Sequence, residues 1–114
     1  MSKFEGKYEA TPELSRIEIE QFLKSSNPCE VADALYSAAR YETDWHWVQS
    51  ECLSRLADSE VAIRWAAATC LGDLAFRRFP IEKELVVPAL EAACRDLAIA
   101  DPALVSLDLV KEFA

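Results

Sequence analysis

The sequence has 114 residues, 52% of them hydrophobic, which suits one domain with its own core and excludes a disordered chain. The formal net charge is −8, from 20 acidic and 12 basic residues, so nucleic acids and anionic membranes are unfavourable partners and a basic protein is a favourable one. The same charge also serves ordinary solubility. Only two glycines are present, which argues against a turn-rich β fold and favours an all-α protein.

The N-terminal residues 1–10 are polar and charged, and we expect them to form an irregular arm ahead of a single helical domain over residues 11–114. This arm lacks the apolar run of a signal peptide. The sequence also contains no stretch approaching the ~20 apolar residues of a membrane span. These features predict a cytoplasmic protein.

Helix signals divide the first half of the chain into three segments. Thr11 is the expected N-cap of a first helix, with Pro12 at its first position. We expect this helix to end near residue 24. A second helix is expected over residues 28–40. Thr43 or Asp44 can then cap a third helix, which ends near residue 57.

The most regular pattern lies between Asp58 and Phe76. Asp58 or Ser59 can cap a helix there, and apolar residues recur at steps of three and four. Gly72 lies inside this helix, where glycine costs about 1 kcal/mol relative to alanine. We therefore expect another helix to pack closely against Gly72.

Two further helices are expected after the break at residues 79–80. The fifth extends from Ile81 to about Leu97 and contains Pro88, which either kinks the helix or marks a later start. Asp101 as N-cap and Pro102 at the first helical position begin the last helix.

A repeat is visible in the second half of the chain. Asp58 and Asp101 lie 43 residues apart, and the apolar residues after each of them align. The helices before them also align once a single extra residue is allowed. A period of 40-odd residues with two helices per unit is typical of HEAT and armadillo arrays, although a less regular helical bundle would look similar.

The stretch 58–74 resembles the first helix of a HEAT repeat. That motif has an Asp in the turn, a Val-Arg pair, two small residues and Leu-Gly-x-Leu. The matching residues here are Asp58, Val61, Ala66, Ala67, Leu71, Gly72 and Leu74, with the arginine displaced by two residues to Arg64. The resemblance covers about two thirds of the chain and implies a short right-handed α-solenoid of about six helices with HEAT-like hairpins. Such arrays are mostly binding surfaces.

Catalytic and metal-binding patterns are absent from the sequence. His46 is the only histidine, and the nearest following cysteine lies six residues away, whereas helical neighbours are three or four residues apart. The cysteines form no C-x-x-C pair, so a zinc site is not expected, nor is any cofactor or enzymatic activity. We expect all of the cysteines to be small buried apolar residues: Cys29, Cys52, Cys70 and Cys94.

The best candidate for recognition is the aromatic and acidic segment 41–51. Trp45 and Trp47 point about 200° apart on a helix, so they do not face the same core. We expect Trp47 to be core and Trp45 to be a partly exposed interface anchor, with Trp45 covering the end of the core as the alternative. The predicted partner-binding residues are Tyr41, Glu42, Asp44, Trp45, His46 and Glu51.

A small, acidic, helical domain without a cofactor is typical of an immunity protein. HEAT-like proteins occur among them, so the resemblance implies a protein that binds and neutralises a basic toxin such as a nuclease. The alternative is a HEAT-like adaptor or scaffold subunit of a larger complex. The last helix offers little polar cover for the end of an array, which leaves self-association open.

Overall fold

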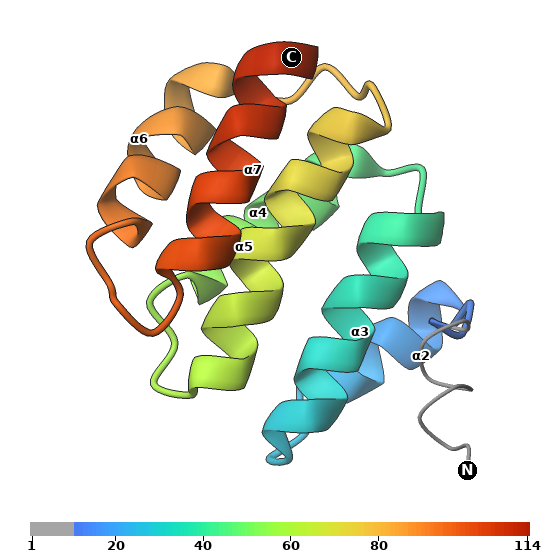
Figure 1. The fold of residues 1–114 in the computed structure, drawn as a ribbon. Helices are drawn as coiled ribbons and strands as arrows, with labels where there is room; N and C mark the ends of the chain where they lie inside the picture. The colour runs from blue at the N-terminus through green and yellow to red at the C-terminus, as the bar shows by residue number, and fades with distance from the viewer. Residues whose placement is uncertain (1–10) are drawn as a thin grey trace, which may run out of the picture.

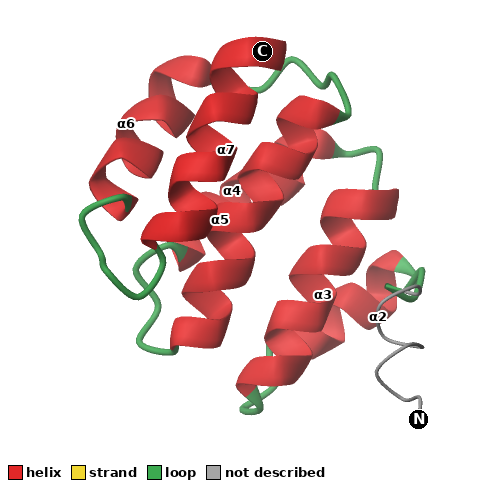
Figure 2. Cartoon of the chain, in the orientation of Figure 1, coloured by secondary structure: helices red, strands yellow, loops and turns green. Residues whose placement is uncertain are grey.

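The structure is a computed structural model that describes residues 11–114, which form helices joined by loops and contain no strand (Figures 1 and 2). The prediction of an all-α fold with about six helices is confirmed. The predicted arm at residues 1–10 lies outside the described residues. The helices are α2 (Arg16–Leu23), α3 (Pro28–Tyr41), α4 (Trp45–Arg55), α5 (Val61–Phe76), α6 (Lys83–Ala93) and α7 (Ala100–Phe113).

Helices α3, α5 and α7 lie side by side and run in the same direction, with α5 in the middle (Figure 1). Helix α4 returns the chain behind α5, and α6 returns it beside α7. Helix α2 packs against α3 at the other edge. The central position of α5 follows from its contacts with α3, α4, α6 and α7. Assignment of these hairpins to the HEAT family in particular stays a prediction.

Small side chains let the neighbours of α5 approach it from both sides. Ala66, Ala67, Ala68 and Cys70 have no exposed surface, and neither does the larger Leu71. The distance between two packed helices depends on the size of the side chains between them. Because those of α5 are mostly alanines, α3 and α7 both pack closely on it.

The closest approach joins α5 to α7 at Gly72. A Cβ atom at this position would lie 2.8 Å from both Cα and Cβ of Ser106, nearer than real contacts allow. The hydroxyl of Ser106 donates a hydrogen bond of 2.6 Å to the carbonyl oxygen of Ala68 on the preceding turn. The expectation of a close packing partner for Gly72 is therefore confirmed.

The start of α2 differs from the predicted cap at Thr11. The helix begins at Arg16 because Ser15 and Glu18 form a capping box. The Ser15 hydroxyl accepts a bond of 3.1 Å from the Glu18 amide, and the Glu18 carboxylate accepts one of 2.9 Å from the Ser15 amide. These reciprocal bonds satisfy two backbone donors, which Thr11 and Pro12 do not achieve.

The predicted caps of α5 and α7 are also wrong. Helix α5 has Glu60 as its N-cap without a side-chain bond, since the Asp58 carboxylate accepts the Glu60 amide at 2.9 Å in the preceding turn. Helix α7 begins before Asp101, with Ile99 as its N-cap.

Helix α6 is shorter at both ends than the predicted span 81–97, and Pro88 lies inside it. The predicted α3 and α4 agree with the structure within one or two residues.

Replacing Gly72 by alanine tests the α5–α7 contact. We expect Gly72→Ala to lower the free energy of unfolding by about 1–3 kcal/mol, because the added methyl group overlaps Ser106. At a helical site with free space, the same change raises stability by up to about 1 kcal/mol. Urea denaturation followed by circular dichroism gives the sign, and a more stable variant would contradict the close approach.

Candidate partner-binding surface

The predicted partner-binding segment begins where α3 ends. Tyr41 is 40% exposed, and its hydroxyl donates a hydrogen bond of 2.9 Å to the carbonyl oxygen of Thr11. Glu42 follows as the C-cap of α3. Arg77, just after α5, donates to the carbonyl oxygens of Ala39 at 2.6 Å and Glu42 at 3.1 Å. The backbone of Glu42 therefore helps to attach the end of α3 to α5.

Asp44 sets the start of α4. Its Oδ1 accepts a hydrogen bond of 3.3 Å from the amide of Trp47, and its Oδ2 lies 3.5 Å from the guanidinium of Arg16. The same guanidinium lies 3.6 Å from the centroid of the Trp47 ring. Trp45 and Trp47 are both half-buried against the core, so the two rings differ less in burial than predicted. Arg16 screens Trp47 from solvent on its outer side.

His46 and Glu51 also have partners within the chain. His46 is exposed, its ring meets Trp45 edge to face at 5.4 Å, and its Nε2 lies 3.3 Å from the carboxylate of Glu82. Glu51 is half-buried and pairs with Arg55 one turn later at 3.1 Å. The predicted residues thus lie along the end of α3 and the first turns of α4, where several of them connect elements of the fold.

Gln49 is a structural residue that the sequence analysis missed. Its side chain is buried, its Nε2 donates to the Glu82 carboxylate at 2.7 Å, and its Oε1 accepts from the Glu82 amide at 2.8 Å. These bonds join α4 to the N-cap of α6. The available signal was a polar residue between the core positions Val48 and Cys52, on the buried side of the predicted helix.

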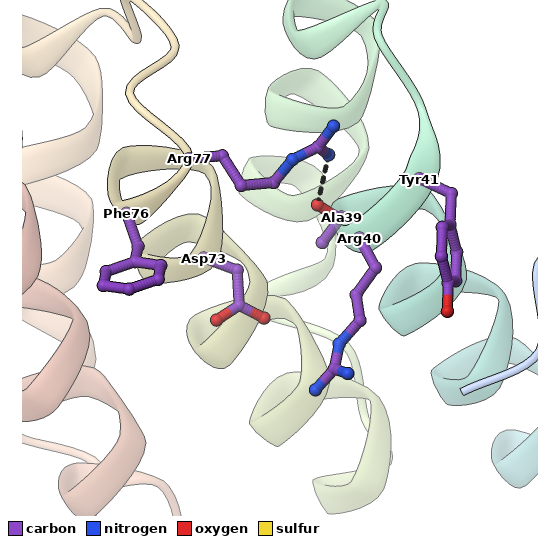
Figure 3. A pocket seen from close by; sticks show the side chains of 6 residues that line it. All are labelled: Ala39, Arg40, Tyr41, Asp73, Phe76 and Arg77. Carbon is purple, nitrogen blue, oxygen red and sulfur yellow. Dashed lines mark hydrogen bonds between the residues drawn. The ribbon is translucent and has the colours of Figure 1, made fainter. Parts of the chain in front are cut away.

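An open pocket of about 460 Å³ lies between the C-terminal ends of α3 and α5 (Figure 3). Asp73 of α5 and Arg40 of α3 face one another across it, with Phe76 and Tyr41 on its two sides. The residues that line the pocket are Ala39, Arg40, Tyr41, Asp73, Phe76 and Arg77.

Burial governs the titration of the groups around this pocket. Desolvation raises the pKa of Asp73 above its usual value, although Arg40 and Arg77 act in the opposite direction. Within residues 11–114, the Asp73 carboxylate forms no ion pair. Burial, followed by the nearby Cys70 and Asp73, raises the pKa of Tyr36 to about 12. Tyr36 therefore stays neutral at physiological pH, and Asp73 is a carboxylate held partly out of water without a paired cation.

The cysteines divide into two groups, so the prediction that all are buried is wrong for some. Cys52 and Cys70 are fully buried, and burial raises the pKa of the Cys70 thiol, which donates to the carbonyl oxygen of Leu35 at 3.3 Å. Cys94 is half-buried. Cys29 is exposed because it lies in the first turn of α3, on the side away from the core.

Metal binding and membrane insertion have no visible basis in the part of the chain that the structure describes. No group of three His, Cys, Asp or Glu side chains in residues 11–114 is placed to hold a metal ion. None of the described helices has the length and apolar character needed to cross a membrane.

Comparisons with known proteins give a match among solved structures. No protein-family model matches the chain, and no curated protein matches it. Among solved structures, the chain is similar to one chain in the crystal structure of a CDI complex from Cupriavidus taiwanensis LMG 19424. The TM-score is 0.84 and the sequence identity is 32%, over 93% of this chain and 96% of that one. The similarity therefore extends over nearly the whole of both chains.

Gln49 offers a test of the connection between α4 and α6. We expect Gln49→Ala to lower the free energy of unfolding by about 1–3 kcal/mol, because the Glu82 amide then loses its acceptor in a partly buried site. Gln21→Ala on the exposed side of α2 is the matched control, with an expected change within about 0.5 kcal/mol. Equal urea midpoints for the two variants would contradict a structural role for Gln49.

Asp73 predicts a specific dependence of stability on pH. Because its pKa is raised in the folded state, protonated Asp73 favours folding at low pH, and this contribution is lost as pH rises through the folded pKa. We therefore expect Asp73→Asn to melt at a slightly higher temperature than the wild type at pH 7. The difference in melting temperature between Asp73→Asn and the wild type should become smaller at pH values below the ordinary aspartate pKa. Exposed Asp33→Asn is the control, and calorimetry across pH 3–7, about the aspartate range, provides the measurement.

Proposed function

Because the chain belongs to the same family as the matched chain of that CDI complex, we propose that it is an immunity protein of a contact-dependent inhibition (CDI) system. In this role it binds and neutralises a toxin without catalysis. The observation that carries the proposal is the 32% identity and TM-score of 0.84 to a chain crystallised in a CDI complex. We further propose that the toxin is a basic protein such as a nuclease.

The charge of the chain supports a basic toxin as the partner. Its net charge is −8 and its isoelectric point is about 4.6. Opposite charges on two proteins accelerate their encounter and disfavour wrong partners, while apolar contacts determine how long the complex lasts.

The segment 41–51 is part of this proposal as a toxin contact. Among the predicted partner-binding residues, Tyr41, Asp44 and His46 are exposed, and they combine aromatic and charged side chains, as interface anchors often do. Glu42, Trp45 and Glu51 are half-buried, so they offer less area to a partner, while the two glutamates add negative charge to the contact.

Co-expression provides the test of function. The probe is the C-terminal domain of the protein encoded directly upstream of this chain in its genome, produced in a bacterium that lacks both genes. We expect this domain to stop growth and the chain to restore it. With an inactivated toxin domain, the association rate should fall about tenfold or more as salt rises from low to high concentration. Salt-independent binding to several unrelated proteins, with no rescue of growth, would indicate an adaptor instead.

The segment 41–51 has its own test within this assay. We expect Glu42→Lys to slow association with the inactivated toxin domain by about threefold to tenfold, because it reverses a charge at the proposed contact. Glu84→Lys on α6 changes the net charge equally and serves as the control. Equal association rates for the two variants would show that the segment 41–51 is not part of the interface. They would not contradict the immunity function.

A further inference from the structure

Exposed apolar side chains gather on the layer formed by α3, α5 and α7. Helix α4 contributes no large exposed apolar residue, and those of residues 11–114 outside the layer are single residues on separate elements: Ile17 on α2, Leu85 on α6 and Leu97 between α6 and α7. On the parallel helices, in contrast, Trp65 is 41%, Phe76 61% and Val105 60% exposed. Large apolar groups that remain in water on one face of a domain commonly mark a protein interface.

These residues belong to one continuous surface. Trp65, Thr69 and Phe76 are spaced by four and seven residues, so they lie along one side of α5. Phe76 meets Phe113 of α7 edge to face at 5.5 Å between ring centroids. Val105 precedes Ser106, the residue of α7 that packs on Gly72. The exposed side of α5 and the adjacent side of α7 therefore form a single strip, here called the outer face.

The charged side chains on α3, α5 and α7 are mostly acidic. Among the exposed and half-buried positions of α3, α5 and α7, six carboxylates stand against three cations, and Arg77 and Arg78 follow the end of α5, with Arg78 over the Phe113 ring. The carboxylates are Glu30, Asp33, Asp73, Asp101, Asp108 and Glu112, and the three cations are Arg40, Arg64 and Lys111. A surface with aromatic residues among carboxylates is complementary to a basic protein surface that also offers an apolar cavity.

Trp65 differs from the tryptophans of α4 in its contacts within the described residues. Within residues 11–114 its ring takes part in no aromatic pair and no cation–π contact, whereas Trp45 contacts His46 and Trp47 lies under Arg16. An exposed tryptophan of this kind adds little to folding and contributes strongly when a partner buries it.

We infer that the toxin-binding surface includes the outer face as well as the segment 41–51, with Trp65 as its apolar anchor and Asp73 as the counter-ion for a lysine or arginine of the toxin. This inference rests on the proposed function and names the surface that performs it. Arg40 faces Asp73 across the pocket, but its side chain makes no ion pair in residues 11–114, so it can turn toward solvent as the toxin's cation enters.

The partial burial of Asp73 supports its role. A carboxylate already held partly out of water has less solvation to lose when a partner covers it, and it gains more from an opposite charge. Its raised pKa also means that the ionised form weakens folding at neutral pH. A residue that lowers stability in the free protein is a good candidate for a role in binding.

The experiment measures the affinity of the inactivated upstream-encoded toxin domain for four variants of the full chain by calorimetry. We expect Trp65→Ala to weaken binding by about 30-fold or more and Asp73→Asn by about tenfold. Leu85→Ala and Glu91→Gln, both on exposed positions of α6, remove the same kinds of group from another face and should stay within about threefold of the wild type. Melting temperatures show whether each variant folds, and Asp73→Asn should melt no lower than the wild type.

The possible outcomes distinguish a failure of the outer-face inference from a failure of the proposed immunity function. No binding by the wild-type chain would overturn the proposed immunity function. Wild-type binding that neither Trp65→Ala nor Asp73→Asn weakens more than the α6 controls would overturn the outer face alone and favour the segment 41–51. Loss of affinity in Asp73→Asn without loss of stability would support the inference, since a purely structural role predicts the opposite.

Discussion

The close approach of α5 to α7 at Gly72 and Ser106 is the constraint on which the rest of the fold depends. It places α5 between two parallel neighbours, which requires small residues on both of its flanks. The larger Leu71 and Leu74 are fully buried and fill the core side of α5. No helix of residues 11–114 covers the remaining side of α5, which is why Trp65 and Phe76 are exposed in this part of the chain.

Helix periodicity predicted the all-α fold well because apolar spacing is a local property of the sequence. At α4 the structure selects Asp44, one of the two predicted cap candidates, whereas the single candidates Thr11 and Asp101 are not the caps of α2 and α7. At the start of α5 the outcome depends on a distant partner. Arg64 donates to the carbonyl oxygen of Asp58 at 2.9 Å and pairs with Asp96 at 2.9 Å, so the turn is set by a contact across 32 residues. No local pattern contains that information.

The candidate surface was less predictable than the fold for the same reason. The segment 41–51 was chosen for its aromatic and acidic composition, but composition does not reveal whether a side chain is already bound within the fold. Arg16 over Trp47 and Glu82 beside His46 become visible only when α2 and α6 are placed. Trp65 was recognisable as lying off the apolar stripe of its helix, whereas its exposure depends on where α3 and α7 lie.

The segment 41–51 and the outer face therefore differ in how many of their side chains are paired within the fold. Around α4, ion pairs, caps and ring contacts join α2, α4 and α6, so substitutions there change folding and binding together. On the outer face, Asp73 has no ion pair in residues 11–114 and weakens folding when ionised, and the Trp65 ring has no aromatic or cation–π partner there. Selection for stability alone would not favour an unpaired, partly buried carboxylate at this place. Its presence beside an open pocket is explained if another protein supplies the missing cation.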